Sequence, residues 1–441
     1  MKWVLLMVFV LLVAIGISSI AAVTTITIAT VANPDMVIMQ ALSPYFEALH
    51  PNIKLNWVIL PENELRQKVT TDIAVHGGAY NVVTIGDYEV PLWAKNGWLV
   101  PFTSLPATYD EGDLISSIKD SLSYKGTLYA LPFYGESSMI YYRKDLFAKA
   151  GLVMPEHPTW NQIETFAKIL NDPSHGVYGI VLRGEPGWGE NMAPIDTVIN
   201  AFGGEWFNMQ WQPQLTSPAF EKAVNFYVNL DRKYGPPGVT SMGFTECETF
   251  FAGGHAAMWY DATVAAGYLS DPKTSSVASD VGFAFAPSDV KKNTGWLWSW
   301  ALAIPSSIPA SSEKSEAART FILWATSKQY IKLVAEKYGW LLVPPGTRYS
   351  TYENPNYLKV ASAFALITEE SIDNADILHP TVNPVPYIGI QYVDIPEFEA
   401  IGTQVGQYIA AALAGTQSVE TALQQSQDYV LNIMKEAGYI K

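Results

Sequence analysis

"TTITIATVANPD" (24–35) begins the stretch that decides the fold class of this chain. Its isoleucines alternate with threonines, which predicts a strand, and a helical pattern follows the Asn-Pro-Asp turn. "IKLNWVIL" (53–60) alternates in the same way and leads into a second helical pattern, and "YNVVTIGDY" (80–88) predicts a third strand. Strands and helices that alternate along a chain predict an α/β fold with a mainly parallel sheet covered by helices.

Three polar residues stand where these predicted strands end: Asn33, Glu62 and Asp87. Ligands of open α/β sheets bind beyond the carboxyl ends of the strands, so these side chains are candidate ligand contacts. Asn33 and Asp87 could instead cap the helices that follow them. Both interpretations stay open for Asn33. For Asp87 the ligand is favoured, because the preceding Gly86 lets the backbone come close to a bound molecule.

The rest of the chain continues the alternation of strands and helices. Helices are expected at 158–170, where Thr159 and Gln162 have the spacing of a capping box, and at 218–235. The remaining predicted elements are a strand at 177–182, a strand running into a helix at 254–269, strands at 281–289 and 298–306, one helix at 312–339, and two helices in the tail, the last at 418–437. Without repeats or a long linker, this order predicts two lobes joined by crossing strands.

Composition excludes some classes of function. The chain has 441 residues, which favours two domains, and 49% of them are apolar, which indicates a packed globular protein. Its formal net charge is −15, whereas a nucleic-acid-binding protein needs a basic face. No nucleic-acid partner is therefore expected, and the acidity is interpreted as a contribution to solubility.

The first 22 residues have the pattern of a secretory signal peptide. Lys2 precedes an apolar run at 3–17, and small residues follow near Ala22. A retained membrane anchor is the alternative, but the apolar run is short for a membrane span. The only cysteine is Cys247, so no lipid-bearing cysteine follows the run and no intrachain disulfide can form. The expected product is an exported, unlipidated, soluble protein of the periplasm.

Signatures of common enzymes are missing from the sequence. It contains no P-loop, dinucleotide-binding, nucleophile-elbow or zinc-protease motif, and its six histidines are scattered. No catalytic residue, metal or cofactor is therefore predicted. A glycoside hydrolase needs only two carboxylates at the right separation, and Glu136, Glu190, Asp261 and Asp87 could supply them. An exported glycosidase remains the enzymatic alternative.

Aromatic and polar residues gather in three clusters. They are "FYGES" (133–137), "RGEPGWGENMAP" (183–194), and "MWYDAT" (258–263) with "GWLWSW" (295–300). A hydroxyl donates and accepts at once, so carboxylates, amides and a guanidinium can all pair with it. Aromatic walls cover the C–H surfaces of such a molecule and exclude water. The clusters therefore favour a neutral ligand with many hydroxyl groups.

Each cluster also has a purely structural interpretation. Trp188, Trp259, Trp298 and Trp300 stand next to glycines or at strand ends, where a cleft is favoured over the core. Trp298 and Trp300 share one face of a strand because strand side chains repeat every two residues, and both are structural if that face is core. Arg183 could form a solvent-facing salt bridge. Glu190 could cap local backbone amides.

These clusters resemble the extracellular solute-binding proteins of ABC transporters, in the sugar-binding, maltose-binding-protein-like class. The resemblance runs from about residue 25 to the C-terminus. General marks of the class are "GWLVPF", "LYALPFYGESSMIYYRKDLFAKAGL", "PTWNQIETFAKIL" and "GHAAMWYDAT". The more specific motifs resemble the branch that binds mannitol, sorbitol or arabitol: "TTDIAVHGG", "IGDYEVPLWAKNGWLV", "GWGENMAP", "YGPPG", "LVPPGTR" and "NPVPYIGIQYVDIPEF".

The resemblance implies a two-lobed periplasmic fold of type II, with each lobe a mainly parallel sheet flanked by helices and three crossover segments as the hinge. The implied division is a signal peptide at 1–22, a first lobe at 23–132 plus 288–340, and a second lobe at 133–287 plus 341–441. The first crossing is the stretch "PFYGESSMIYYRKDLF" (132–147). Glu136 then lies in the cleft, where its oxygens are expected to accept hydrogen bonds from ligand hydroxyls.

The resemblance also implies the ligand site and the partners. Contacts are expected from Asn33, Glu62, Asp87, Tyr134, Glu136, Arg183, Trp188, Glu190, Asn191, Trp259 and Asp261, with Trp298, Trp300 and Arg348 as further contacts. The implied ligand is a sugar alcohol or a related small carbohydrate, with a ring-form monosaccharide as the alternative. The implied protein partner is the transmembrane permease of an ABC transporter, and the implied state of the protein is a monomer.

Overall fold

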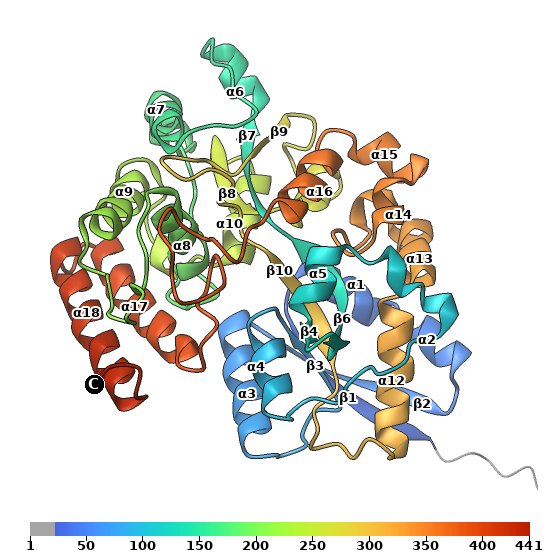
Figure 1. Cartoon of the computed structure of the whole chain (residues 1–441). Helices are drawn as coiled ribbons and strands as arrows, with labels where there is room; N and C mark the ends of the chain where they lie inside the picture. The colour runs from blue at the N-terminus through green and yellow to red at the C-terminus, as the bar shows by residue number, and fades with distance from the viewer. Residues whose placement is uncertain (1–22) are drawn as a thin grey trace, which may run out of the picture.

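The computed structural model describes residues 23–441, and the signal peptide expected at 1–22 lies outside them. Two sheets with helices packed around them organise the chain (Figure 1). We call the body around the five-stranded sheet the first lobe, and the body around the three-stranded sheet the second lobe. The expected two-lobed α/β architecture is confirmed.

The sheet of the first lobe has the strand order β2-β1-β3-β10-β6. Its strands are β1 (Thr24–Val31), β2 (Ile53–Leu60), β3 (Val82–Ile85), β6 (Ala130–Glu136) and β10 (Trp298–Ala303). β1 is parallel to β2 and β3, whereas β10 is antiparallel to both of its neighbours. One reversed strand therefore interrupts a sheet that is otherwise parallel, because β10 brings the chain back from the second lobe and β6 leads it out.

The three-stranded sheet of the second lobe has the order β8-β7-β9. Its strands are β7 (Ser138–Arg143), β8 (Met258–Ala262) and β9 (Val281–Phe285). β7 is antiparallel to both neighbours, so the prediction of a mainly parallel sheet in each lobe is wrong here. The chain leaves the first lobe along β7 and returns toward it along β9. These two neighbouring strands therefore run in opposite directions.

The strand predicted at 177–182 is reduced to two isolated parallel bridges, from Tyr178 to Ala256 just before β8 and from Val181 to Trp259 within β8. The amide of Ile180 between them donates to the carbonyl of Tyr234 at the end of helix α9 (Pro218–Tyr234), at 3.2 Å. Because the amide of Ile180 donates to Tyr234 and not to the neighbouring strand, the run of hydrogen bonds between strands is interrupted there. The segment nevertheless delivers Arg183 to the edge of the second lobe.

Helices cover both sheets. Around the first sheet lie α1 (Pro34–Ala41), α2 (Ser43–Leu49), α3 (Glu62–Ala74), α4 (Glu89–Lys95), α5 (Ser116–Ser121), α12 (Glu313–Ala325) and α13 (Lys328–Tyr338), with the short hairpin β4 (Ser123–Tyr124) and β5 (Thr127–Leu128). The single helix predicted at 312–339 is two helices. Ser327 starts the second one, because its hydroxyl accepts from the amide of Tyr330.

The other helices, apart from 3-10 turns, build the second lobe and the tail. They are α6 (Lys144–Lys149), α7 (Trp160–Leu170), α8 (Met192–Ala201), α9, α10 (Phe244–Ala252), α11 (Ala265–Ser270), α14 (Tyr349–Tyr352), α15 (Pro355–Ala361), α16 (Ala365–Asp373), α17 (Phe398–Leu413) and α18 (Val419–Glu436). The tail thus holds more helices than the two predicted, because α14, α15 and α16 are too short to show a clear period. The capping box predicted at Thr159 is present at the start of α7.

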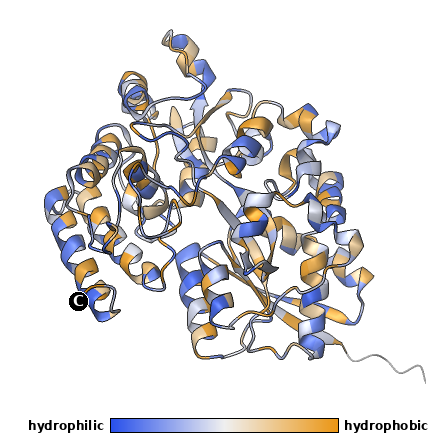
Figure 2. Ribbon diagram, in the orientation of Figure 1, coloured by the Kyte–Doolittle hydropathy of each residue, from blue (hydrophilic) through white to orange (hydrophobic). Residues whose placement is uncertain are grey.

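Apolar and polar residues alternate around the helices, as Figure 2 shows. In α7 the buried residues are Trp160, Ile163, Phe166, Ala167 and Leu170, which form one apolar face of the helix. Among residues 23–441, no helix combines the length and the apolar character that crossing a membrane requires.

The chain passes between the sheets at neighbouring places. β6 continues into β7 with only Ser137 between them, and β9 is followed by β10 after a loop at 286–297. The backbone amide of Gly135 donates to the carbonyl of Pro345, which joins the first crossing to the segment after α13. A Cβ atom at Gly346 would lie 1.9 Å from the carbonyl oxygen of Gly135, so glycine is required for this close approach.

Candidate ligand-binding site

A cavity of about 210 Å³ lies between the two lobes. Its walls come from the ends of β1 and β6, the first turns of α3, strand β10 and the loop before α8. Polar and aromatic side chains line it together: Asn33, Glu62, Arg66, Tyr134, Glu136, Arg183, Glu185, Trp188, Glu190, Phe244, Glu246, Trp296, Trp298, Trp300 and Gln391. Pockets for drug-sized ligands span about 300–1,000 Å³, so this cavity suits a smaller molecule.

The structure brings nine of the fourteen predicted site residues together at this cavity. They are Asn33, Glu62, Tyr134, Glu136, Arg183, Trp188, Glu190, Trp298 and Trp300. The other five are not part of its lining: Asp87, Asn191, Trp259, Asp261 and Arg348. The expectation that these five contact the ligand directly is therefore corrected below, with the place of each.

Asn33 combines the two interpretations that the sequence left open. Its carboxamide oxygen accepts from the amide of Met36 at 3.0 Å and caps α1, while its NH₂ group donates to the Tyr134 hydroxyl at 2.9 Å. Tyr134 comes from β6, so this bond joins the ends of two strands at the cavity. The Tyr134 hydroxyl accepts from Asn33 and keeps its own proton for another partner.

Glu136 is 6% exposed at the end of β6. Burial raises its pKa well above the usual value, and the nearby Arg183 opposes that shift. The nearby indole N–H of Trp296 also lowers the pKa of Glu136. Within residues 23–441, however, this N–H makes no hydrogen bond of ordinary geometry. A buried carboxyl group without well-placed protein donors gains free energy when a ligand supplies them.

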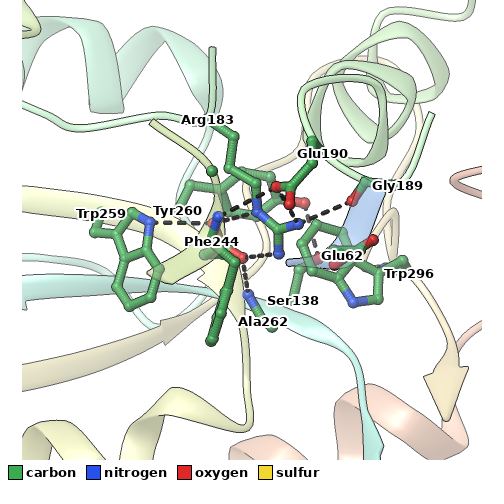
Figure 3. A network of polar contacts seen from close by, with 12 residues as sticks. Glu62, Ser138, Arg183, Gly189, Glu190, Phe244, Trp259, Tyr260, Ala262 and Trp296 are labelled. Atoms are coloured by element: carbon green, nitrogen blue, oxygen red, sulfur yellow. Dashed lines mark hydrogen bonds and ion pairs between the residues drawn. The ribbon is translucent and has the colours of Figure 1, made fainter. Parts of the chain in front are cut away.

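Arg183 is buried at 5% exposure and is held by the second lobe, so the solvent-facing interpretation is wrong. Its Nε and Nη2 donate to the two oxygens of Asp261 at 2.9 and 2.5 Å, and Nη1 donates to the carbonyl of Gly189 at 2.9 Å. Figure 3 shows Arg183 between Trp259 on one side and Glu190 with Gly189 on the other. Burial opposes the charge of Arg183, but Asp261 outweighs it and holds the arginine pKa above its usual value.

Asp261 and Trp259 lie behind the cavity wall, both with 0% exposure. The Asp261 carboxylate receives Arg183, the amide of Ala262 at 2.7 Å and the indole N–H of Trp259 at 3.1 Å. Trp259 stacks on Tyr141 with ring centroids 5.0 Å apart. These two residues position Arg183 and leave no polar atom free for a ligand.

Glu190 also combines two roles. One of its oxygens accepts from the amide of Phe244 at 3.2 Å and lies 3.5 Å from the guanidinium of Arg183, and the side chain lines the cavity. Burial and the charge of Glu62 raise the pKa of Glu190 well above its usual value. Glu190 therefore caps backbone and borders the ligand space.

Three more predicted residues have structural surroundings. Asn191 accepts from the amide of Gly187 and donates to the carbonyl of Gly406, so it holds the loop before α8. Asp87 is 1% exposed and accepts from the amide of Ser299 at 3.1 Å. Arg348 is 0% exposed and donates to the carbonyls of Asp110 and Thr326.

The ring of Trp298 packs directly against the backbone at Gly86, which has no side chain. A Cβ atom there would lie 2.0 Å from the ring of Trp298. The prediction that Gly86 allows a close approach to the backbone is therefore right, but the group that approaches is Trp298 of strand β10 and not a ligand.

Arg66 is the main wall residue that sequence reasoning missed. It stands one turn after Glu62 on α3, with its guanidinium 4.0 Å from the ring centroid of Trp188 and 4.7 Å from that of Trp300. The spacing of Glu62 and Arg66 was the available signal, because positions i and i+4 share a helix face. Trp296 and Gln391 were also missed, although both stand inside quoted motifs.

The tryptophan wall is continuous. The ring centroids of Trp188 and Trp298 lie 5.9 Å apart and those of Trp298 and Trp300 lie 5.5 Å apart, each pair edge to face. Carboxyl, guanidinium and hydroxyl groups face the same space. Among residues 23–441, no cluster of three metal-ligating side chains is found. The arrangement can bind a small neutral molecule through many hydroxyl groups.

Comparison with known proteins agrees with this geometry. A mannitol-binding protein of Pseudomonas aeruginosa is 54% identical over 418 residues, which cover 95% of this chain and 94% of that protein. A solute-binding protein from Agrobacterium vitis S4, solved with bound D-mannitol, has a TM-score of 0.91 and 54% identity, and the match covers 95% of this chain and all of that one. A solute-binding protein from Agrobacterium radiobacter K84, solved with ribitol, has a TM-score of 0.82 and 27% identity, and that match covers 94% of this chain and 99% of the other.

The family model described as bacterial extracellular solute-binding protein matches residues 32–332. That range holds both sheets except strand β1, and nearly all of the cavity wall, with Val31 and Gln391 outside it. This chain belongs to the family of bacterial extracellular solute-binding proteins.

Proposed function

We propose that the chain captures a sugar alcohol in the cavity between its lobes and delivers it to the permease of an ABC transporter. The observation that carries the proposal is the cavity lining, in which Glu136, Arg183 and Glu190 face a wall of tryptophans. An alditol offers a hydroxyl on every carbon, so it can pair with each of these groups while its C–H edges lie against the rings.

Mannitol is the first ligand to test. Two proteins that share 54% identity with this chain are a mannitol-binding protein and a solute-binding protein solved with D-mannitol. The relative solved with ribitol extends the candidates to five-carbon alditols. Sorbitol and arabitol stay in the panel because they differ from these alditols only in stereochemistry or length.

Capture follows from the position of the cavity. Its walls belong to both lobes, so a bound ligand favours the closed arrangement over the open one. We take residues 23–132 plus 288–340 and residues 133–287 plus 341–441 as the two moving bodies. The three crossings act as the hinge, and the closed form presents both lobes to the two halves of the permease.

The proposal includes a place in the cell. Residues 1–22 direct export and are removed, and the mature protein works as an unlipidated monomer in the periplasm. No cofactor and no nucleic acid take part. Mass spectrometry of the secreted protein would locate the cleavage site, and light scattering would give the mass in solution.

Titration calorimetry of the mature protein tests the ligand. The panel holds mannitol, sorbitol, arabitol, ribitol and xylitol, with glucose, mannose and fructose as ring-form controls. Binding of one or more alditols without binding of the ring-form sugars is expected. Binding of ring sugars alone would favour the monosaccharide alternative, and hydrolysis of a chromogenic glycoside would favour a glycosidase.

Glu136→Gln tests the site. The substitution keeps the shape and removes the charged acceptor, so the affinity for the best alditol should fall by about 1.5–3 kcal/mol, which is the usual contribution of a hydrogen bond to a charged group. Glu64→Gln is the matched control, because Glu64 lies half-exposed on α3 beside Lys68 and away from the cavity lining. Equal affinities of the two variants would remove Glu136 from the list of charged ligand contacts.

A further inference from the structure

We infer that the segment Gly187-Trp188-Gly189 is a latch that closes the two lobes on each other even without ligand, with Arg66 as the positioning residue for Trp188. This inference rests on the proposed function, since the latch sets how long an alditol stays bound. Both sides of the latch are protein, so its contribution to closure exists before any ligand arrives.

Trp188 belongs to the second lobe, where the ring of Phe398 lies 6.1 Å from its own, yet it also contacts side chains of the first lobe. It is 3% exposed. The Arg66 guanidinium is 4.0 Å from its ring centroid, and the ring of Tyr88 is 4.9 Å away, edge to face. Cation–π contacts are stronger at desolvated sites such as this one than at exposed sites.

Arg66 is fixed by its own lobe. Its Nε and Nη2 donate to one oxygen of Glu62 at 3.0 and 2.8 Å, and its Nη1 donates to Glu89 at 2.6 Å. Burial opposes the charge of Arg66, but Glu62 and Glu89 outweigh it and raise the arginine pKa. The flat face of a permanently charged guanidinium therefore stands ready to receive Trp188 when the lobes meet.

The two glycines that flank Trp188 point to the same contact. Neither has a positive φ, so the backbone conformation does not require glycine at 187 or 189. A Cβ atom at Gly187 would lie 2.4 Å from Oδ1 of Asn63, and one at Gly189 would lie 2.3 Å from Oε1 of Glu62. Both obstacles belong to the first turn of α3, so only the approach of the first lobe excludes a side chain.

Hydrogen bonds tie the latch down on both sides. Asn63 donates to the carbonyl of Pro186 at 3.2 Å and to Glu185 at 3.3 Å, across the lobes. Within the second lobe, Asn191 accepts from the amide of Gly187 at 3.2 Å and donates to Gly406. The loop is thus held in shape by its own lobe and docks as a preformed unit.

Gly187→Ala is the cleanest variant, because residue 187 is not part of the cavity lining and the three atoms nearest to its new methyl group, at 2.4–3.1 Å, all belong to Asn63. Gly189→Ala places a methyl group against two side chains held by ion pairs and should act more strongly. Gly112→Ala is the matched control, since the nearest atom to its Cβ lies 4.0 Å away. Circular dichroism and a melting curve show that each variant folds.

The first readout needs no ligand. Spin labels on Val75→Cys and Met209→Cys, one exposed position in each lobe, report the distribution of interlobe distances, and the buried Cys247 stays unlabelled. Ligand-free wild type should show a closed population that Gly187→Ala and Gly189→Ala reduce and Gly112→Ala does not. Absence of any closed population in the ligand-free wild type would overturn the latch.

The second readout is the dissociation rate of D-mannitol. Loss of one cross-lobe hydrogen bond corresponds to about two- to tenfold, so Gly187→Ala should speed dissociation by that factor while association changes less. In the Asn63→Ala background, Gly187→Ala should not change the dissociation rate further, because the Asn63 side chain that its methyl group would meet is absent. Equal rates in wild type and both glycine variants, or full additivity with Asn63→Ala, would overturn the inference. If no alditol binds the wild type, the proposed function fails, and the ligand-free distances still decide whether the latch exists.

Discussion

Trp259 shows how a side chain can serve the site without touching the ligand. It is fully buried, stacks on Tyr141 and donates to Asp261, which in turn fixes Arg183. Trp259→Ala should therefore destabilise the whole protein by about 3–5 kcal/mol, as large truncations in a core do. Chemical denaturation measures the loss. A variant with wild-type stability and weakened binding would instead place Trp259 at the ligand.

Asp231 on α9 is a buried carboxyl group that the ligand site does not use. It is 3% exposed, its Oδ1 has no hydrogen-bond partner within residues 23–441, and burial raises its pKa to about 8. The native state thus binds a proton that the unfolded chain, with a pKa near 3.9, releases earlier. The contribution of the Asp231 proton to the free energy of unfolding is fully present below about pH 4 and is lost as the pH rises toward 8.

Asp231→Asn should remove the decrease in stability that Asp231 causes as the pH rises from 4 to 8. The stability of the variant relative to wild type should grow by on the order of 1 kcal/mol per pH unit between pH 4 and pH 8, and stay level above. Urea denaturation across that range measures it. Asp120→Asn, at an exposed position on α5, is the control and should show no such trend. A difference independent of pH would mean that Asp231 is ionised in the native protein.

At the scale of elements, helix α7 owes its start to a reciprocal pair. The Thr159 hydroxyl accepts from the amide of Gln162, and the Gln162 side chain accepts from the amide of Thr159. Thr159→Ala should cost about 1 kcal/mol of stability because it leaves a helix N–H unsatisfied. Thr165→Ala, on the exposed side of the same helix, is the control and should cost nothing. Equal effects of the two substitutions would contradict the capping role.

The crossings also act as elements. β6 belongs to the sheet of the first lobe and β7 to that of the second, with one residue between them. The close contact of Gly135 with Gly346 joins the first crossing to the segment after α13, backbone to backbone. If the lobes move as proposed, a hinge built in this way should confine the motion to a few residues, with Tyr134 and Glu136 next to it.

At the scale of the whole molecule, ligand binding should stabilise both lobes together, because the cavity wall comes from both. D-mannitol at about 100 times its dissociation constant should add about 2.7 kcal/mol to the stability of the mature protein. Differential scanning calorimetry measures the rise in melting temperature. Glu136→Gln at the same mannitol concentration should gain less, and an unchanged wild-type melting temperature would contradict mannitol as the ligand.

The sequence by itself determined the elements whose pattern is local. The strands at β1, β2 and β3, helix α7 with its capping box, and the wall residues that follow strand ends or glycines were all predictable. Periodicity and capping depend on neighbours in the chain, so a sequence displays them directly. The clusters around Glu136, Arg183 and Trp188 were predictable for a related reason, because aromatic and charged residues gather where a cleft needs both.

Only the tertiary structure decided which side of a wall each residue occupies. Asp261 and Arg183 stand in equally conspicuous motifs, but their ion pair places Asp261 behind the wall. Arg66 gained its role from three tryptophans distant in sequence, and the second sheet became antiparallel because the chain leaves and returns through it. Pairing between distant segments leaves no periodic trace in the sequence, since it depends on how the folded lobes bring those segments together.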